Sequence, residues 1–556
     1  GVPIPKPIPA VPDGQTISCA QDLMGGRLWV YHRIEPMPYT LETLNFDTRF
    51  SRVPNSFQLY LQGLNPVQIL TSAYVERGDM AYLLFAKGFL DSWLSYAASP
   101  NAEKNLYYFS SGHAVSLRAE NLMYFGQACA KAGLAVGGLY ELLFRHGVWL
   151  RDERNFNGTH NYGFMQNQAL IHLGYVLDYP EWVTCAKKRL SAQLRDSFDS
   201  EYVHLENSPA YADMVIDLVQ RTGAYLRAQQ DPLGQALLDD IEKAQEFMRW
   251  AVKPDGTMAQ IGDTPTAPPR EAMDSRQPPP SGRRFFQQAG YYFYRSSGGA
   301  PDKQDTWKAL KAGFTRTTHK HADDTSFLLY ARGLDVFVDC GMYGYAQDDF
   351  RGYFRSAKAH NTVVTDDGTY PITQSKAHLL GVEEHRFSPE YDYIRVFNHA
   401  YSGVQFTREF ISSGDATILI DRTSGGREHT YSQLFHLGEE AELLYASNDE
   451  VVVRLGKSGY HVRLRQFGPS PALSAIFGDV RTPGYGLISR GENHLSPIYT
   501  LKFDLSGKTG LWITVITVED REGTVVLQEG AESYTNIFYD RARHCIALGK
   551  TTISLS

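Results

Sequence analysis

Two different spacings of apolar residues divide the chain. In the first half, apolar positions recur every three or four residues, as in helices that bury one face. The connections are short, so successive helices are expected to form antiparallel pairs, and many such pairs in succession predict an α/α toroid. The predicted helices cover residues 65–74, 80–96, 117–133, 134–150, 164–177, 182–198, 211–229 and 233–252.

The second half has the sequence pattern of a β-sheet protein. A stretch rich in proline, residues 263–284, reads as a linker or long loop. Short alternating runs separated by Gly, Asp, Asn and Ser follow it, which predicts an antiparallel β-sandwich. The runs lie at residues 289–295, 312–317, 326–331, 336–339, 393–397, 417–421, 451–454, 511–518 and 524–528.

The pattern therefore predicts a multidomain α+β protein. An N-terminal α/α toroid is expected in residues 1–284, followed by a C-terminal antiparallel β-sandwich in residues 285–556. A chain of 556 residues is too long for one ordinary core, which agrees with two domains. A cleft between two domains is a preferred place for a ligand site.

The composition of the chain limits the kinds of partner and environment that we expect for the protein. The formal net charge is −8, so no excess of basic residues favours nucleic acid. The longest apolar run, residues 511–518, is too short to span a bilayer as a helix. The five cysteines form no CxxC motif and are expected to be buried free thiols. The chain begins without Met, so we expect a periplasmic or secreted protein whose signal peptide has been removed.

A histidine-rich stretch, Thr-Thr-His-Lys-His at residues 317–321, is the first candidate site. In an extended strand His319 and His321 would face one cavity, while the lysine between them would face away. Asp339 ends a neighbouring strand-like run, and His360 begins a third segment. Two imidazoles and one carboxylate from three neighbouring segments suit a divalent metal, most plausibly zinc, and leave one histidine for chemistry.

A second candidate lies in the helical half, in Asn-Gly-Thr-His-Asn-Tyr-Gly at residues 157–163. The segment precedes a predicted helix, whose N-terminal N–H groups and dipole attract a carboxylate. His160 and Asn161 are placed to hold such a group. The alternative is a capping segment, with Asn161 as the N-cap and His160 exposed.

A third candidate is His204-Leu-Glu206-Asn-Ser-Pro-Ala-Tyr211. Ser-Pro marks the start of the next helix, which places Tyr211 in its first turn. There the helix dipole and nearby cations would lower the pKa of the phenol. The alternative is that Tyr211 only packs.

Together these motifs resemble the heparinase II/III-like polysaccharide lyases, a family of toroid-plus-sandwich enzymes acting on heparin, heparan or alginate. The resemblance runs from about residue 117 to 366, with all motifs in order. It is carried by Asn161-Tyr-Gly, His204-x-Glu206-x-Ser-Pro-x-Tyr211, His319-x-His321-Ala-Asp, Val338-Asp339-x-Gly-x-Tyr343 and Arg355-Ser-x-x-x-His360-Asn-Thr.

The resemblance implies β-elimination at a uronic acid residue of an anionic polysaccharide, either a glycosaminoglycan or alginate. Tyr211 and His319 correspond to the acid/base pair, and Asn161 to the residue that neutralises the substrate carboxylate. Many relatives have Asn-His-Gly where this chain has Asn-Tyr-Gly, so the missing imidazole is either supplied by His160 or lost. Three further residues correspond to the ligands of a structural zinc ion in the family, namely His321, Asp339 and His360.

Further residues near the motifs are expected to contact the polymer. His204 and Glu206 alternate on one face if their segment is extended. Three arginines, Arg118, Arg351 and Arg355, could pair with uronate or sulfate groups. The alternative for all three is pairing with neighbouring acidic residues of the chain, namely Glu120, Asp348 or Asp349.

Two other functions fit parts of the pattern. A glycoside hydrolase on a helical toroid would need two carboxylates across the cleft, such as Glu206 with Asp323 or Asp324. A non-catalytic polysaccharide-binding protein could use the same cleft. A lyase creates an unsaturated uronate that absorbs in the near-UV, whereas a hydrolase or a binding protein does not.

Overall fold

The structure is a computed structural model that describes residues 1–270, 280–296, 302–519, 537–540, 545–548 and 551–554. It divides into two compact units, Gly1–Ser197 with Val215–Ile241, and Phe198–Met214 with Glu242–Ser556. The division falls within two helices, α10 (Pro209–Ala228) and α11 (Pro232–Ala251). Segment 198–214 therefore belongs to the sheet-containing unit. The predicted boundary between residues 284 and 285 stays a prediction.

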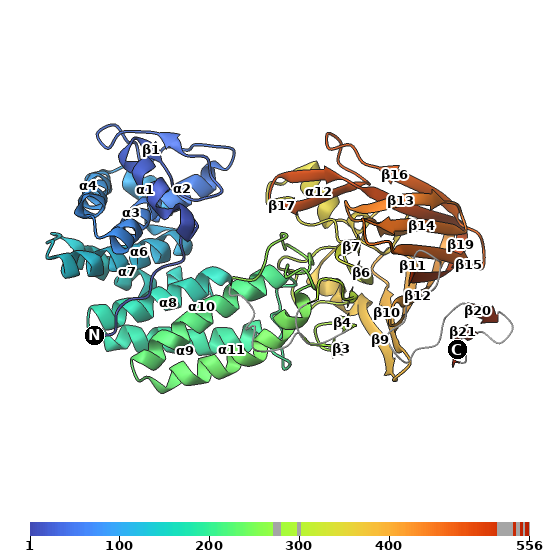
Figure 1. Cartoon of the computed structure of the whole chain (residues 1–556). Helices are drawn as coiled ribbons and strands as arrows, with labels where there is room; N and C mark the ends of the chain where they lie inside the picture. The colour runs from blue at the N-terminus through green and yellow to red at the C-terminus, as the bar shows by residue number, and fades with distance from the viewer. Residues whose placement is uncertain (271–279, 297–301, 520–536, 541–544, 549–550, 555–556) are drawn as a thin grey trace. The chain divides into compact units, whose positions relative to one another are not determined.

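The first unit is helical (Figure 1). Local signals fix its helix ends: Asp79 and Ser111 accept hydrogen bonds from backbone N–H groups of the first turns of α4 and α6, and glycines with positive φ end α3 and α6. Besides parts of α10 and α11, its helices are α1 (Thr16–Met24), α2 (Pro54–Gln62), α3 (Asn65–Arg77), α4 (Met80–Ala97), α5 (Leu106–Phe109), α6 (Gly112–Ala132), α7 (Leu139–Arg151), α8 (Asn161–Val176) and α9 (Pro180–Ser197).

The second unit contains two large antiparallel sheets. The smaller has the order β3-β4-β5-β6-β7, and the larger has the order β13-β14-β15-β19-β12-β11-β10-β9, with β16 on β19 and β8 on β12. The smaller sheet comprises β3 (Gly282–Phe286), β4 (Tyr291–Arg295), β5 (Trp307–Lys311), β6 (Ser326–Ala331) and β7 (Leu334–Phe337). The larger comprises β8 (Val363–Thr365), β9 (Leu380–Phe387), β10 (Asp392–Asn398), β11 (Val404–Ser413), β12 (Ala416–His436), β13 (Ala441–Ala446), β14 (Glu450–Leu455), β15 (His461–Phe467), β16 (Ala472–Phe477) and β19 (Tyr499–Glu519).

Smaller elements complete the second unit. A short helix, α12 (Asp349–Arg355), follows the smaller sheet along the chain. Two hairpin-like sheets add β17 (Leu487–Gly491) with β18 (His494–Pro497), and β20 (Ile537–Asp540) with β21 (Cys545–Leu548) and β22 (Thr551–Ser554).

One hydrophobic core joins the two large sheets. It combines Leu310 and Phe327 of the smaller sheet with Phe410 and Leu434 of the larger, all of them buried. Two sheets that share one core form a sandwich. The predicted fold class, an N-terminal helical region followed by an antiparallel sheet domain, is confirmed.

Two of the predicted strands are not confirmed. The run at residues 312–317 is not a strand, because β5 ends at Lys311. The chain turns there through Gly313, which has a positive φ of 87° and so departs from the extended conformation of a strand. The run at residues 524–528 lies outside the described residues.

β5 carries a buried lysine whose charge can be tested. The Nζ atom of Lys308 donates to Ser412 Oγ at 3.0 Å and to the carbonyl of Ala416 at 2.8 Å. Burial lowers the pKa of Lys308 to about 7. The folded protein therefore binds fewer protons than the unfolded chain between about pH 7 and pH 10, so stability rises with pH in that window.

We expect the replacement Lys308→Met to remove this dependence. Relative to the variant, the wild-type free energy of unfolding should rise by about 1.4 kcal/mol per pH unit between about pH 7 and pH 10. Urea denaturation at a series of pH values measures it, with the exposed Lys457→Met as the control. A difference between wild type and Lys308→Met that stays constant with pH would contradict the assignment.

Candidate active site

The first part of the site is the start of α10. Asn207 has a positive φ of 59°, and the chain then enters the helix at Ser208-Pro209. Proline suits a first helical turn, and the Ser208 hydroxyl accepts a hydrogen bond from Tyr211 N at 3.4 Å. The same hydroxyl donates to the carbonyl of Asp263 at 2.9 Å. Tyr211 is thus held in the first turn, as the sequence predicts.

The second part is the loop that carries His319. The prediction of an extended strand here is wrong, because His319 has a φ of 56° and β6 begins only at Ser326. The side-chain amide of Asn207 holds the loop by donating to the carbonyls of Arg316 at 2.6 Å and Thr318 at 3.0 Å. A Cβ at Gly262 would lie 2.6 Å from the carbonyl oxygen of His319, so only glycine fits beside the loop.

These two parts bring a phenol and an imidazole together. The rings of Tyr211 and His319 stack with centroids 3.5 Å apart and planes 11° apart. The hydroxyl of Tyr211 lies 2.5 Å from that of Tyr345, which belongs to the loop before α12. Burial raises the pKa of Tyr345 to about 12, so its hydroxyl stays protonated and is able to donate. Tyr211 and His319 are both partly exposed, as groups that meet a substrate must be.

A buried carboxylate, Asp263, joins the site from residues that the sequence reads as linker. Its oxygens lie 3.0 Å from His319 Nδ1 and 2.8 Å from His321 Nε2, and they accept two hydrogen bonds from the guanidinium of Arg351 at 2.6 and 3.0 Å. Burial opposes its ionisation, but His319, His321 and Arg351 hold the pKa of Asp263 well below its usual range. No local spacing marked it, since it lies 56 residues from His319 in the chain.

Glu206 and His204 lie on the other side of His319. Glu206 Oε2 is 3.4 Å from His319 Nε2. Burial lowers the pKa of His319, but hydrogen bonding to Asp263 and the nearby Glu206 outweigh it, so the net shift is upward. Burial lowers the pKa of His204 to about 4, and only 4% of that residue is exposed. Both residues are buried, so neither presents a surface to a polymer in this conformation.

The predicted metal ligands lie next to this network. The rings of His321 and His360 have centroids 5.6 Å apart, and Asp339 Oδ2 is 2.7 Å from His360 Nδ1. Within the described part of the chain, no group of three or more His, Cys, Asp or Glu side chains is arranged to hold a metal ion. The donor types nevertheless fit, because His321 Nδ1 and His360 Nε2 are buried and have no hydrogen-bond partner among the described residues. Asp339 would orient His360, as carboxylates often do for metal-binding histidines.

Residues 278–497 match the model of the family described as heparinase II/III-like, C-terminal. The sequence carries a heparinase II/III-like C-terminal domain. This confirms the resemblance that the motifs predicted. No curated protein sequence matches the chain significantly.

Solved structures extend the comparison beyond residues 278–497. A mutant of heparan sulfate lyase HepC from Pedobacter heparinus is 16% identical, with a TM-score of 0.71 over 98% of this chain and 88% of that one. Heparinase III is 15% identical, with a TM-score of 0.78 over 100% and 93%. Chondroitinase AC lyase is 9% identical, with a TM-score of 0.54 over 91% and 81%. At these identities the likeness shows the fold alone.

The two predicted substrate arginines differ. Arg118, in the helical unit, is fully buried, and its guanidinium donates to His146 Nε2 and to the carbonyls of Gln62 and Tyr108. The prediction that it binds substrate, or pairs with an acidic residue, is therefore wrong. Arg355 ends α12 and is half-buried, and among the described residues its side chain has no hydrogen bond or ion pair. It remains available to an anion.

Asn161 and His160 belong to the helical unit. Asn161 is the first residue of α8 and is buried, and its Oδ1 accepts from Tyr162 N at 2.9 Å. His160 is exposed and occupies the N-cap position, with its Nδ1 3.3 Å from Tyr162 N. The capping role thus falls to His160 rather than to Asn161. Their contact with a substrate carboxylate stays a prediction.

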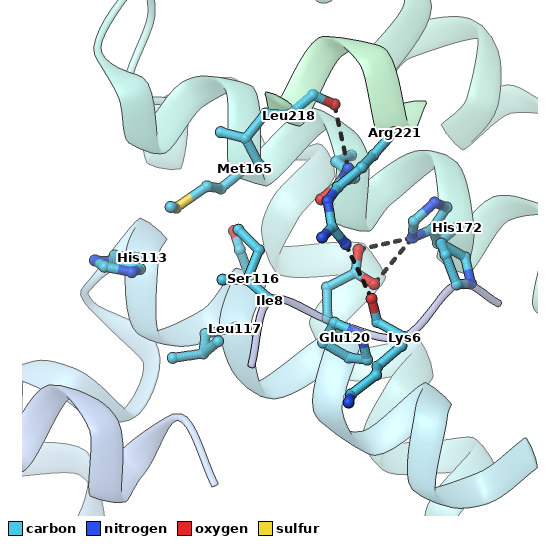
Figure 2. Close-up of a pocket in the computed structure, with 13 residues that line it drawn as sticks. Lys6, Ile8, His113, Ser116, Leu117, Glu120, Met165, His172, Leu218 and Arg221 are labelled. Carbon is cyan, nitrogen blue, oxygen red and sulfur yellow. Dashed lines mark hydrogen bonds and ion pairs between the residues drawn. The ribbon is translucent and has the colours of Figure 1, made fainter. Parts of the chain in front are cut away.

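A cavity in the helical unit is a separate feature (Figure 2). The N-terminal residues 5–8 and side chains from α6, α8 and α10 enclose about 50 Å³. His172 Nδ1 lies 2.8 Å from Glu120, and Arg221 donates to the carbonyl of Lys6 at 3.1 Å. Ligand pockets usually measure about 300–1,000 Å³, so this cavity is too small for a sugar ring. In the part of the chain that the structure describes, no helix is long and apolar enough to cross a membrane.

Proposed function

We propose that the protein is a polysaccharide lyase that cleaves a uronic-acid-containing polysaccharide by β-elimination. The observation that carries the proposal is the stacked pair of Tyr211 and His319 within one unit. The heparinase II/III-like domain and the fold of known heparan and chondroitin lyases support it. The substrate class is a glycosaminoglycan of the heparan, hyaluronan or chondroitin type, or alginate.

β-Elimination removes the proton at C5 of the uronate and expels the glycosidic oxygen at O4. In the proposed reaction Tyr211 and His319 share the two proton transfers, one as base toward C5 and the other as acid toward O4. The protonated hydroxyl of Tyr345 lies 2.5 Å from the Tyr211 oxygen and would stabilise that oxygen as it loses a proton.

The carboxylate of the uronate must also be neutralised, because negative charge builds up as the C5 proton leaves. A single well-placed donor is typically worth about 3 kcal/mol of barrier. We assign this role to Asn161, assisted by His160, as the resemblance implies. When a divalent metal is bound by His321 and His360, it would supply a fixed positive charge that rigidifies the loop carrying His319.

The aspartates that a glycoside hydrolase would need are engaged in other contacts. Asp323 and Asp324 are buried and both pair with Lys320, and Asp324 also accepts from Tyr370 at 2.7 Å. Both carboxylates are therefore already paired inside the protein rather than available as a catalytic pair. Incubation with heparan sulfate, hyaluronan, chondroitin and alginate decides between the functions. A near-UV absorbance on at least one polymer is expected, whereas new reducing ends without absorbance would indicate a hydrolase, and binding alone a binding protein.

Arg355 is expected to bind the anionic polymer. Arg355 follows Arg351 by four residues on α12, so the two side chains lie on one face of the helix, and Arg351 contacts Asp263 of the site. Burial and the neighbouring Arg351 lower the pKa of Arg355, and Asp263 opposes this. The replacement Arg355→Ala should raise KM about tenfold, because a charge-assisted hydrogen bond is worth about 1.5–3 kcal/mol. Initial rates over a range of polymer concentrations measure this.

The control for Arg355 removes the same charge elsewhere. Arg481 is exposed, and among the residues that the structure describes it pairs only with Asp479 in its own turn. Its replacement by Ala should leave KM unchanged. An equal rise in KM for both variants would assign the effect to net charge rather than to a contact by Arg355.

A further inference from the structure

We propose that Asp263 is a positioning residue whose single buried carboxylate holds one ring nitrogen of each of two neighbouring histidines and thereby orients His319 for proton transfer. The inference rests on the proposed lyase function for the role of His319. The placement of Asp263 itself can be tested without any substrate.

The contacts of Asp263 determine where the protons lie. An ionised carboxylate only accepts hydrogen bonds, so each imidazole nitrogen that faces it must carry a proton. For His319 this nitrogen is Nδ1, at 3.0 Å, and for His321 it is Nε2, at 2.8 Å. The second ring nitrogen of His319, Nε2, faces Glu206 Oε2 at 3.4 Å. The second ring nitrogen of His321, Nδ1, is buried and has no hydrogen-bond partner among the described residues.

The same residue also clamps the loop by its backbone. Asp263 N donates to the carbonyl of His319 at 3.3 Å, so His319 is held at both its main chain and its ring. This matters because His319 has a left-handed backbone, which a non-glycine residue keeps only when its surroundings enforce it. Gly262 makes the close approach possible, since any side chain there would meet the carbonyl of His319.

Arg351 completes the arrangement. Its planar guanidinium grips both oxygens of Asp263, at 2.6 and 3.0 Å, which fixes the plane of the carboxylate. It also lies 5.4 Å from the ring centre of Tyr345, whose hydroxyl contacts Tyr211. Asp263 and Arg351 therefore link the two halves of the acid/base pair. Arg351 binds a carboxylate of the chain, so it is not a free cation for substrate.

The first test is kinetic and uses the full chain. The replacement Asp263→Asn should lower kcat about 10- to 100-fold and leave KM within about threefold. In a His319→Ala background the same replacement should cause no further loss, because Asp263 acts through His319. A loss that multiplies with that of His319→Ala would overturn the proposal.

A matched control separates positioning from general damage to the fold. Asp415 is also buried, pairs with Arg332 and accepts a hydrogen bond from Thr306, but it contacts none of the site residues in the described structure. Asp415→Asn should lower Tm while kcat stays within about twofold. If Asp415→Asn lowers kcat as far as Asp263→Asn does, loss of any buried ion pair suffices and the proposal fails.

The second test needs no substrate. With 15N-labelled histidine and metal removed, imidazole spectra should show His319 protonated at Nδ1 and His321 at Nε2. Asp263→Asn should change the imidazole spectra of both His319 and His321, whereas Asp415→Asn should change neither. Unchanged spectra in Asp263→Asn would overturn the proposal. If no polymer is cleaved, the lyase function fails, but these spectra still decide the placement of Asp263.

A second variant is available if Asp263→Asn does not fold. The replacement Arg351→Lys removes the bidentate contact with Asp263, so it should change the same spectra and lower kcat. Unchanged spectra and an unchanged kcat would refute the proposal.

Discussion

Replacing Tyr211 with Phe is expected to lower kcat by about 10³-fold while the protein still binds the polymer. The change removes only the hydroxyl, because phenylalanine keeps the ring that stacks on His319. A group that transfers a proton in the transition state is worth about 10²- to 10⁴-fold in rate. The initial rate of near-UV absorbance measures kcat, and calorimetric titration with the polymer measures binding.

The control for Tyr211 is a tyrosine whose hydroxyl has a purely structural contact. Tyr431 is buried in β12, and its hydroxyl donates to the carbonyl of Lys508 at 3.1 Å. Tyr431→Phe should cost about 1 kcal/mol of stability and leave kcat unchanged. A Tyr211→Phe variant with kcat close to wild type would end the assignment of Tyr211 as an acid or base.

The local structure around Tyr211 could be predicted from the sequence. The helix that bears it was predictable because Ser-Pro fixes the start and apolar spacing fixes the buried face, both of which act within a few residues. Its place beside His319 was predictable only through the resemblance, since the two residues are far apart in the chain. The structure supplies the reason for their meeting: segment 198–214 packs in the sheet-containing unit.

The conformation of His319 and the role of Asp263 could not be predicted from the sequence. An extended backbone was the natural expectation for Thr-Thr-His-Lys-His, but contacts from Asn207, Gly262 and Asp263 impose a left-handed conformation at His319. Asp263 itself stands at the start of a proline-rich stretch, where composition indicates a loop. Its burial depends on three partners from distant segments, and no periodicity within its own segment encodes them.

The predicted metal site gives the second large effect. We expect zinc to raise the Tm of wild-type protein by several degrees, because a ligand that binds only the folded state stabilises it by about 2.7 kcal/mol at one hundred times its Kd. His321 and His360 are the proposed ligands, since each has a buried ring nitrogen with no hydrogen-bond partner among the described residues. In His360→Ala the zinc-dependent rise in Tm should disappear. Scanning calorimetry with zinc, and after chelation, measures it.

A second histidine distinguishes loss of the site from loss of any buried imidazole. His429 is buried and pairs with Asp366, and among the described residues it contacts neither His321 nor His360, so His429→Ala should keep the zinc-dependent rise. Activity then separates the two possible roles of the ion. Chelated wild-type protein that stays folded and active would support a structural ion, because His319 would still be held by Asp263. Chelated protein that loses activity at unchanged Tm would instead place the ion in the chemistry, and a zinc effect that persists in His360→Ala would remove this histidine from the site.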